Sequence, residues 1–124
     1  METIIINNIS FKGLPLEPYC NLEHKLFAYY VGENGTVWSA KNRKFLEPIM
    51  TPSGYYRIRL KYKSYKLHFL MAYTYFEKFR ENPSMDVHHI NGNKLDNNLS
   101  NIMPLTREEH KSIHGRKIFG RNIP

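Results

Sequence analysis

Two pairs of histidines near the C-terminus constrain the fold of this chain more than any other feature. Residues 86–114, DVHHINGNKLDNNLSNIMPLTREEHKSIH, contain four of the six histidines in the 124-residue sequence. His88 and His89 are adjacent, whereas His110 and His114 are four residues apart. Histidines at positions i and i+4 lie on one face of a helix, where they can chelate a metal ion. The clustering therefore indicates a metal site assembled from two separate elements.

The residues around these histidines predict a strand, a polar loop, a second strand and a helix. Thr106 followed by Glu109 fits the capping box T-x-x-E, which marks the start of a helix. Because side chains alternate along a strand, only one of His88 and His89 can face that helix directly, so the two imply different roles. The expected ranges are 86–90 for the first strand, 91–98 for the loop, 100–103 for the second strand and 106–115 or slightly beyond for the helix.

The upstream residues predict an antiparallel sheet and one helix. Asn34-Gly35 is a hairpin signal between two apolar runs. Residues 55–63 alternate between apolar and basic side chains, which is typical of a strand with one basic face. Residues 66–80 have apolar side chains at helical spacing, and the first 26 residues predict a short strand followed by loop. We therefore expect an α+β protein in which an N-terminal antiparallel β-sheet plus helix precedes a ββα-metal module.

The distribution of charge favours a nucleic-acid partner. The formal net charge is +7, and between Lys41 and His68 eight basic residues accompany one acid, Glu47. Such a one-signed concentration favours contact with phosphates, although it is also compatible with a solvated strand face. The predicted DNA contacts are Arg57, Arg59, Lys61, Lys63, Arg116 and Lys117.

The absence of other signals points to a soluble protein. No segment has the length needed to span a bilayer, so we expect no membrane partner. The single cysteine, Cys20, permits no internal disulfide and fits a reducing compartment. We accordingly expect a cytoplasmic protein, in the host cytoplasm if the gene is carried by a phage. Monomer and homodimer both remain open.

The histidine constellation resembles the HNH endonuclease family, also called the ββα-metal motif. The resemblance rests on His88-His89, Asn101, His110 and His114, with nine residues from Asn101 to His110. It covers roughly residues 29–114. There GTVWS, GYYRIRL and KLHFLMA are similar to segments of small phage- and intron-encoded HNH homing endonucleases.

The resemblance implies a role for each of these residues. His88, His110 and His114 would bind one divalent metal ion, His89 would be the general base, and the amide oxygen of Asn101 would accept a hydrogen bond from its ring and orient it. Mg²⁺ or Mn²⁺ would serve catalysis, while a three-histidine set also suits Zn²⁺ or Ni²⁺. Many relatives carry Asp at the position of His88 and Asn at that of His110, so the identity of the metal stays open.

The function implied is metal-dependent hydrolysis of DNA phosphodiester bonds by a free-standing, phage-type homing endonuclease or nickase. A neutral histidine can take a proton from water near pH 7, and a divalent ion can neutralise charge on the phosphoryl group. We expect residues 1–80 to form a DNA-recognition region, residues 81–116 the catalytic module and residues 117–124 a basic tail.

The same residues are compatible with other interpretations. The protein could be a metal-stabilised DNA-binding protein without catalysis, a chain with a purely structural zinc site, or a nonspecific, toxin-like nuclease. We interpret His68 as a packing or DNA-contacting residue rather than a catalytic one. Asn93, Asn97 and Asn98 are interpreted as loop residues that satisfy backbone groups.

Overall fold

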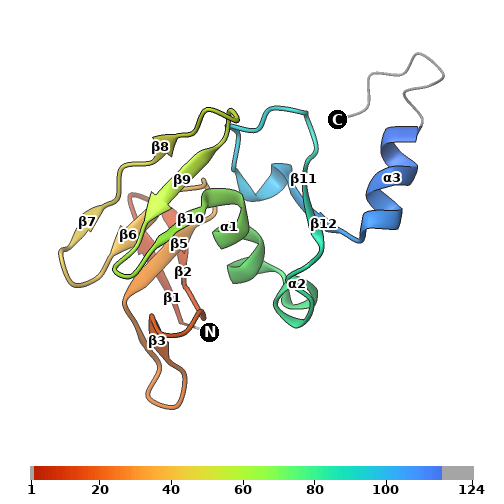
Figure 1. Cartoon of the computed structure of the whole chain (residues 1–124). Helices are drawn as coiled ribbons and strands as arrows, with labels where there is room; N and C mark the ends of the chain where they lie inside the picture. The colour runs from red at the N-terminus through yellow and green to blue at the C-terminus, as the bar shows by residue number, and fades with distance from the viewer. Residues whose placement is uncertain (1, 116–124) are drawn as a thin grey trace.

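The computed structural model describes residues 2–115, with side chains to residue 113. Antiparallel sheets occupy the first half of the chain, and helix α1 lies between them and a C-terminal ββα unit (Figure 1). In chain order the elements are β1 (Thr3–Ile6), β2 (Ile9–Gly13), β3 (Cys20–Asn21), β4 (Leu26–Phe27), β5 (Tyr29–Gly32), β6 (Val37–Ser39), β7 (Lys44–Phe45), β8 (Ile49–Met50), β9 (Tyr56–Arg59), β10 (Ser64–Lys66), α1 (Leu67–Tyr75), α2 (Glu77–Glu81), β11 (Asp86–His89), the 3₁₀ turn η1 (Leu99–Asn101), β12 (Ile102–Leu105) and α3 (Arg107–Gly115). The expected α+β class is confirmed.

The N-terminal sheet has the strand order β1-β2-β5-β6-β7. Asn7 and Asn8, at φ 53° and 64°, form the turn between β1 and β2, a conformation that asparagine tolerates better than most residues. The first 26 residues thus form more sheet than the expected strand and loop. The predicted hairpin over 29–39 is present, with Gly35 at φ +79° in its turn.

The predicted long basic strand is a hairpin. β9 pairs with β10, and the chain reverses where Leu60 N–H donates to the carbonyl of Lys63 at 3.0 Å. Ile58 and Leu60 are buried, as their alternation predicted, whereas Lys61 and Lys63 lie at the reversal instead of on a continuous strand face. Together with β8 these strands form a second, three-stranded sheet.

Helix α1 is the centre of the core. Leu70, Met71 and Ala72 are fully buried, and the apolar cluster around them includes Leu14 from the N-terminal part and Ile102 from β12. The helix predicted over 66–80 is interrupted at Phe76, whose φ of −123° and ψ of 108° are extended, and α2 follows. One continuous core thus joins the sheets to the C-terminal unit.

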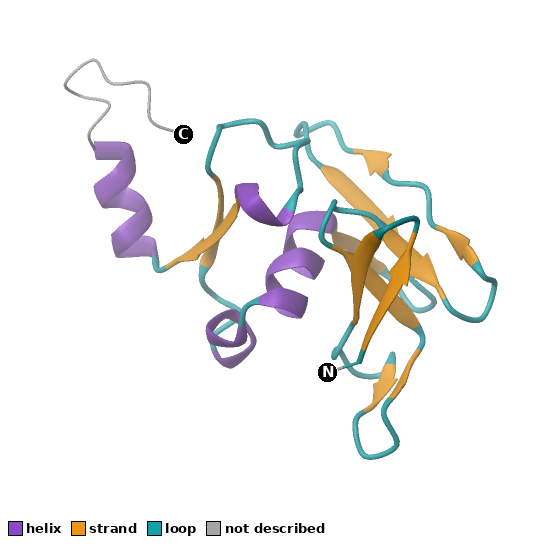
Figure 2. Ribbon diagram, turned by 180° about the vertical axis from the view of Figure 1, so that it is seen from behind, coloured by secondary structure: helices purple, strands orange, loops and turns teal. Residues whose placement is uncertain are grey.

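The C-terminal unit has the predicted ββα order. β11 pairs antiparallel with β12, so that His89 is opposite Ile102 and His88 is opposite Met103. The expected capping box is present at α3: Thr106 N–H donates to Glu109 Oε1 at 2.8 Å, and Glu109 N–H donates to Thr106 Oγ1 at 3.1 Å. Both ribbon views place the β11–β12 pair between α1 and α3 (Figures 1 and 2).

Within residues 2–115, no helix combines the length and the apolar character needed to cross a bilayer.

Candidate active site

Strand β11 sends its two histidines to different neighbours, as the alternation of side chains requires. The ring of His88 meets that of His110 on α3, with centroids 5.2 Å apart and an interplanar angle of 63°. The ring of His89 meets that of His68 on α1, with centroids 5.1 Å apart and an angle of 82°. Both strand histidines are buried, and each belongs to a separate cluster.

The cluster on the α3 side includes a carboxylate. Asp86 lies two residues before His88 and therefore points to the same side of β11. Its Oδ2 is 3.0 Å from Nδ1 of His110, and its Oδ1 is 4.0 Å from Nε of Arg107. A carboxylate that contacts one ring nitrogen of a histidine fixes the ring and directs the other nitrogen toward a ligand.

The predicted metal ligands are brought together in part. His88 and His110 lie close enough for both imidazoles to share one ion, and Asp86 adds the carboxylate that often supports such a histidine. Among the described side chains, no three His, Cys, Asp or Glu residues converge on one point. The backbone of His114 is in α3, but its side chain lies outside the described residues. The donor chemistry of His88 and His110 fits a divalent ion of the Zn²⁺ or Ni²⁺ type.

His89 has its hydrogen bond to Asn97 rather than to Asn101. Nε2 of His89 is 2.9 Å from Oδ1 of Asn97, and both side chains are buried. Sequence reasoning missed Asn97 because an asparagine in an Asn-rich loop is usually explained by local turns. Asn93 fits that explanation, since its Oδ1 accepts from Leu95 N–H at 3.0 Å.

Asn101 holds the loop between the strands. Its Oδ1 accepts from Asn91 N–H at 2.8 Å, and its Nδ2 donates to Asn91 Oδ1 at 3.0 Å and to the carbonyl of Asp96 at 2.8 Å. The expected hydrogen bond from the His89 ring to the Asn101 amide oxygen is absent among the described residues, because the ring is bonded to Asn97. Asn101 instead uses its amide to close the loop that follows β11, where it satisfies the N–H of Asn91 and the carbonyl of Asp96.

His68 is the neighbour of His89 that sequence reasoning undervalued. It lies in the first turn of α1, in edge contact with His89 and with Tyr55, whose ring centroid is 5.6 Å away. Burial lowers the pKa of His68 to about 4, and the proximity of His89, Lys66 and Lys94 adds to the effect. Its Nδ1 is buried without a partner among the described residues. The one sequence signal was the position of this histidine in KLHFLMA, one of the segments on which the resemblance to small HNH homing endonucleases rests.

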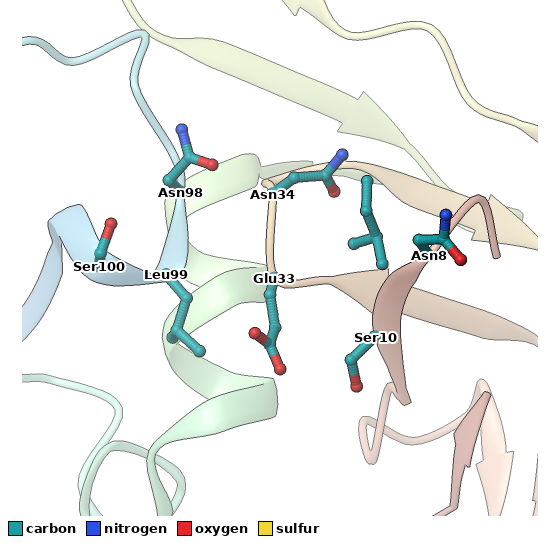
Figure 3. Close-up of a pocket in the computed structure, with 8 residues that line it drawn as sticks. Asn8, Ser10, Glu33, Asn34, Asn98, Leu99 and Ser100 are labelled. Atoms are coloured by element: carbon teal, nitrogen blue, oxygen red, sulfur yellow. The ribbon is translucent and has the colours of Figure 1, made fainter. Parts of the chain in front are cut away.

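A cavity of about 420 Å³ lies between α1, α2 and the α3 side of β11. Lys66, His68, Asp86 and His110 supply its polar lining, and Phe69, Phe79, Pro83, Met85 and Val87 supply its apolar lining. A second hollow, of about 530 Å³, lies away from the histidines, where the β5–β6 turn meets the loop before η1 (Figure 3). Its labelled side chains are polar except for Leu99, and Glu33 makes it unsuited to phosphate. Of these two hollows, the first contains residues of the histidine clusters, His68 and His110.

The predicted DNA-contacting residues are exposed where they are described. Arg57 and Arg59 share the exposed face of β9, and Lys61 and Lys63 follow in the reversal. The ammonium group of Lys63 lies 5.1 Å from the ring centroid of Tyr65. Arg116 and Lys117 lie outside the described residues.

Comparison with known proteins identifies the C-terminal part of the chain. Residues 66–112 match the model of an HNH endonuclease family. An uncharacterized HNH endonuclease, L245, of Acanthamoeba polyphaga mimivirus is 32% identical over 106 residues, covering 82% of this chain and 29% of the relative. YosQ, an SPbeta prophage-derived protein of Bacillus subtilis assigned to the HNH homing endonucleases, is 30% identical over 95 residues, covering 73% of this chain and 53% of the relative.

A solved structure supports the same assignment. The fold matches that of the HNH homing endonuclease I-HmuI, described for its DNA binding and cleavage, with a TM-score of 0.69 and 25% identity. The match covers 89% of this chain and 59% of the other, so this chain spans only part of the length of each relative. The resemblance predicted from the histidine spacing is confirmed: residues 66–112 of this chain match the HNH endonuclease family, and both relatives and the solved structure carry the same family name.

Proposed function

We propose that this chain is a metal-dependent DNA endonuclease of the homing type. One observation carries the proposal: β11 divides its adjacent histidines, placing His88 beside His110 and Asp86, and His89 beside Asn97. A site with separate places for a metal and a base is what hydrolysis of a phosphodiester requires. The named activities of the relatives agree with it.

The α3 side of β11 would hold the metal. His88 and His110 are the ligands that the geometry supports, and His114, one turn beyond His110, is the third by spacing. Because Asp86 contacts Nδ1 of His110, ligation from that ring would use Nε2. A divalent ion bound there supplies charge neutralisation for the phosphoryl oxygens and for the leaving 3′ oxygen.

The other side of β11 would supply the base. His89 accepts a proton from the water whose oxygen attacks phosphorus, and the bond between phosphorus and the 3′ oxygen breaks. The leaving oxygen takes a proton from solvent, so the products carry a 5′-phosphate and a 3′-hydroxyl. Asn101 keeps the loop after β11 closed and so preserves the position of His89 through the backbone.

DNA would approach across the basic hairpin toward the cavity. Lys66 is exposed at the start of α1 and also lines the cavity that contains His68 and His110. Arg57 is the cross-strand partner of Lys66 in the β9–β10 hairpin, and Arg59 lies two residues further along β9. A groove that combines positive charge with a buried reactive site would hold a phosphate near His89. Arg116 and Lys117 are proposed as further contacts from their sequence positions alone.

The main alternative is a DNA-binding protein that retains the metal fold without cleavage. The two are separated by incubating the full chain with supercoiled plasmid in the presence of Mg²⁺, Mn²⁺, Zn²⁺ or Ni²⁺, with and without chelator. Conversion to nicked or linear DNA that requires metal supports the nuclease. Metal-dependent binding without any conversion under all four ions would favour the alternative. Nicked or linear product also distinguishes a nickase from a double-strand endonuclease.

A further inference from the structure

Asn97 is unlike the other asparagines of its loop, because its side chain is buried. Only 4% of the residue is exposed, whereas Asn91, Asn93 and Asn98 are exposed to solvent. The Oδ1 atom of its amide accepts a hydrogen bond from Nε2 of His89 at 2.9 Å. Its Nδ2 atom has no partner among the described residues. A buried amide that serves a single ring nitrogen indicates a role toward that ring.

The chemistry of this contact determines where the ring carries its proton. An amide oxygen can only accept a hydrogen bond, so Nε2 of His89 must be the donor. In a neutral imidazole the other nitrogen, Nδ1, then bears the lone pair. We propose that Asn97 is the positioning residue for His89, fixing the tautomer in which Nδ1 is the proton acceptor. The inference rests on the proposed function of His89 as the general base.

A turn of the N-terminal sheet holds Asn97 in place. Leu99 N–H donates to the carbonyl of Glu33 at 2.8 Å, which ties the loop to the β5–β6 turn. A Cβ atom at Gly35 would lie 2.7 Å from the carbonyl oxygen of Asn97, so the turn contacts the backbone of Asn97 directly. Figure 3 shows the Glu33–Asn34 side of this junction beside Asn98 and Leu99. The proposed support of the base thus extends to Gly35, which is more than fifty positions before His89 in the sequence.

Gly35 is required at this junction for two reasons. Its φ of +79° disfavours any residue with a side chain, and the contact with Asn97 leaves no space for one. Gly54, in the turn before β9, has φ +83°, but a Cβ atom there would meet nothing within 4 Å. Alanine at either position would therefore adopt a similarly unfavourable φ, but only alanine at position 35 would also collide with Asn97. This makes Gly54→Ala a matched control for Gly35→Ala.

The ring nitrogens of His89 give a test that needs no cleavage. In ¹⁵N-labelled full-length protein near pH 7.5, Nε2 of His89 should have the chemical shift of a protonated nitrogen and Nδ1 that of an unprotonated one. Asn97→Gln keeps a neutral amide oxygen as acceptor and should preserve this assignment. Asn97→Leu removes the acceptor and should give an averaged pair of shifts. A proton on Nδ1 in the wild type, or identical spectra in all three proteins, would overturn the inference.

Cleavage under single-turnover conditions at saturating metal tests the consequence. Asn97→Leu should lower the rate about 10- to 100-fold, as removal of a residue that orients another functional group commonly does. Asn97→Gln should restore most of it, and the concentration of DNA giving half the maximal rate should not change. Gly35→Ala should lower the rate and Gly54→Ala should not, with melting temperatures confirming that each variant is folded.

These outcomes separate this inference from the proposed function. If Asn97→Gln were as slow as Asn97→Leu, or Gly54→Ala as slow as Gly35→Ala, the loss would reflect general structure and the inference would be wrong. If His89→Ala cleaved like the wild type, the assignment of the base would fail instead. In that case the ring-nitrogen shifts would still decide whether Asn97 fixes the tautomer of His89.

Discussion

At the scale of single residues, the two adjacent histidines of β11 have different neighbours. His88 contacts His110, whereas His89 contacts Asn97 and His68. A strand separates neighbouring side chains completely, so one dipeptide can serve two clusters at once. This separation is what lets mutation of one histidine be compared with mutation of the next.

Replacing each strand histidine should therefore have different effects. His89→Ala should lower cleavage by at least about 100-fold, the scale of general-base catalysis, while metal content and DNA affinity stay near the wild type. His88→Ala should lose metal and melt at lower temperature, because metal binding is coupled to folding. Metal content, DNA binding and plasmid nicking are measured on both variants. Release of metal by His89→Ala alone would reverse the two roles.

His68 should make stability depend on pH. Its folded pKa of about 4 is below its ordinary value of 6.5, so the unfolded chain binds a proton that the folded chain does not. As pH falls from 6.5 toward 4, the free energy of unfolding should decrease by up to about 1.4 kcal/mol per pH unit, or about 3 kcal/mol in all. Above pH 6.5 the residue is neutral in both states and contributes no slope.

The measurement is urea unfolding at pH 7.5, 6.5, 5.5 and 4.5. His68→Phe keeps an aromatic ring but cannot bind a proton, so its stability should fall less steeply with acid than that of the wild type. His24 is exposed, and His24→Phe is the control that should retain the wild-type slope. Equal slopes for wild type and His68→Phe would show that His68 is not buried as a neutral ring.

At the scale of secondary-structure elements, α3 depends on its capping box. The helix has nine residues, too few to be stable alone in water. Thr106→Ala removes one of the two reciprocal hydrogen bonds and should destabilise the protein by about 1 kcal/mol. Because α3 carries His110, metal affinity should fall as well. Ser112→Ala, an exposed substitution in the same helix, is the control that should leave both quantities unchanged or slightly raised.

The hairpin of β9 and β10 is the proposed contact with DNA. Replacing Arg57 and Arg59 with Ala should weaken binding and make its salt dependence shallower, by about one unit of slope for each phosphate that the protein no longer neutralises. Metal content should not change. Replacing Lys25 and Lys78, which are exposed on other elements, removes the same charge and should alter the slope less. Equal changes for the two pairs would show that only net charge matters.

Much of the C-terminal unit could be predicted from sequence because its signals are local. The capping box and the alternation of His88 and His89 each depend on a few neighbouring residues, as does the Asn34-Gly35 turn of the N-terminal sheet. The reversal at Lys61–Lys63 was missed because it has no glycine or asparagine and the alternating pattern continues through it. Asn97 and His68 were misjudged because their importance comes from packing against His89, and that contact depends on the tertiary fold.

At the scale of the whole molecule, a single core connects the sheets, α1 and the ββα unit. Residues as distant in sequence as Leu14 and Ile102 belong to the same buried cluster. A fragment of residues 81–124 should therefore fail to fold alone even with metal, because it would expose the face of β12 that packs on α1. Circular dichroism and amide-proton dispersion of the fragment, with and without Zn²⁺, give the measurement. A folded fragment would show the unit to be independent.

Helix α1 begins directly where β10 ends, with no intervening linker, and its first turn carries the histidine that touches His89. The hairpin proposed to contact DNA is therefore continuous with the helix that packs against the proposed base. If the proposed function holds, the phosphate that is cut should lie at a constant offset from the base pairs that β9 contacts. Changing that offset would require a different connection between β10 and α1, because no linker residues separate the two elements.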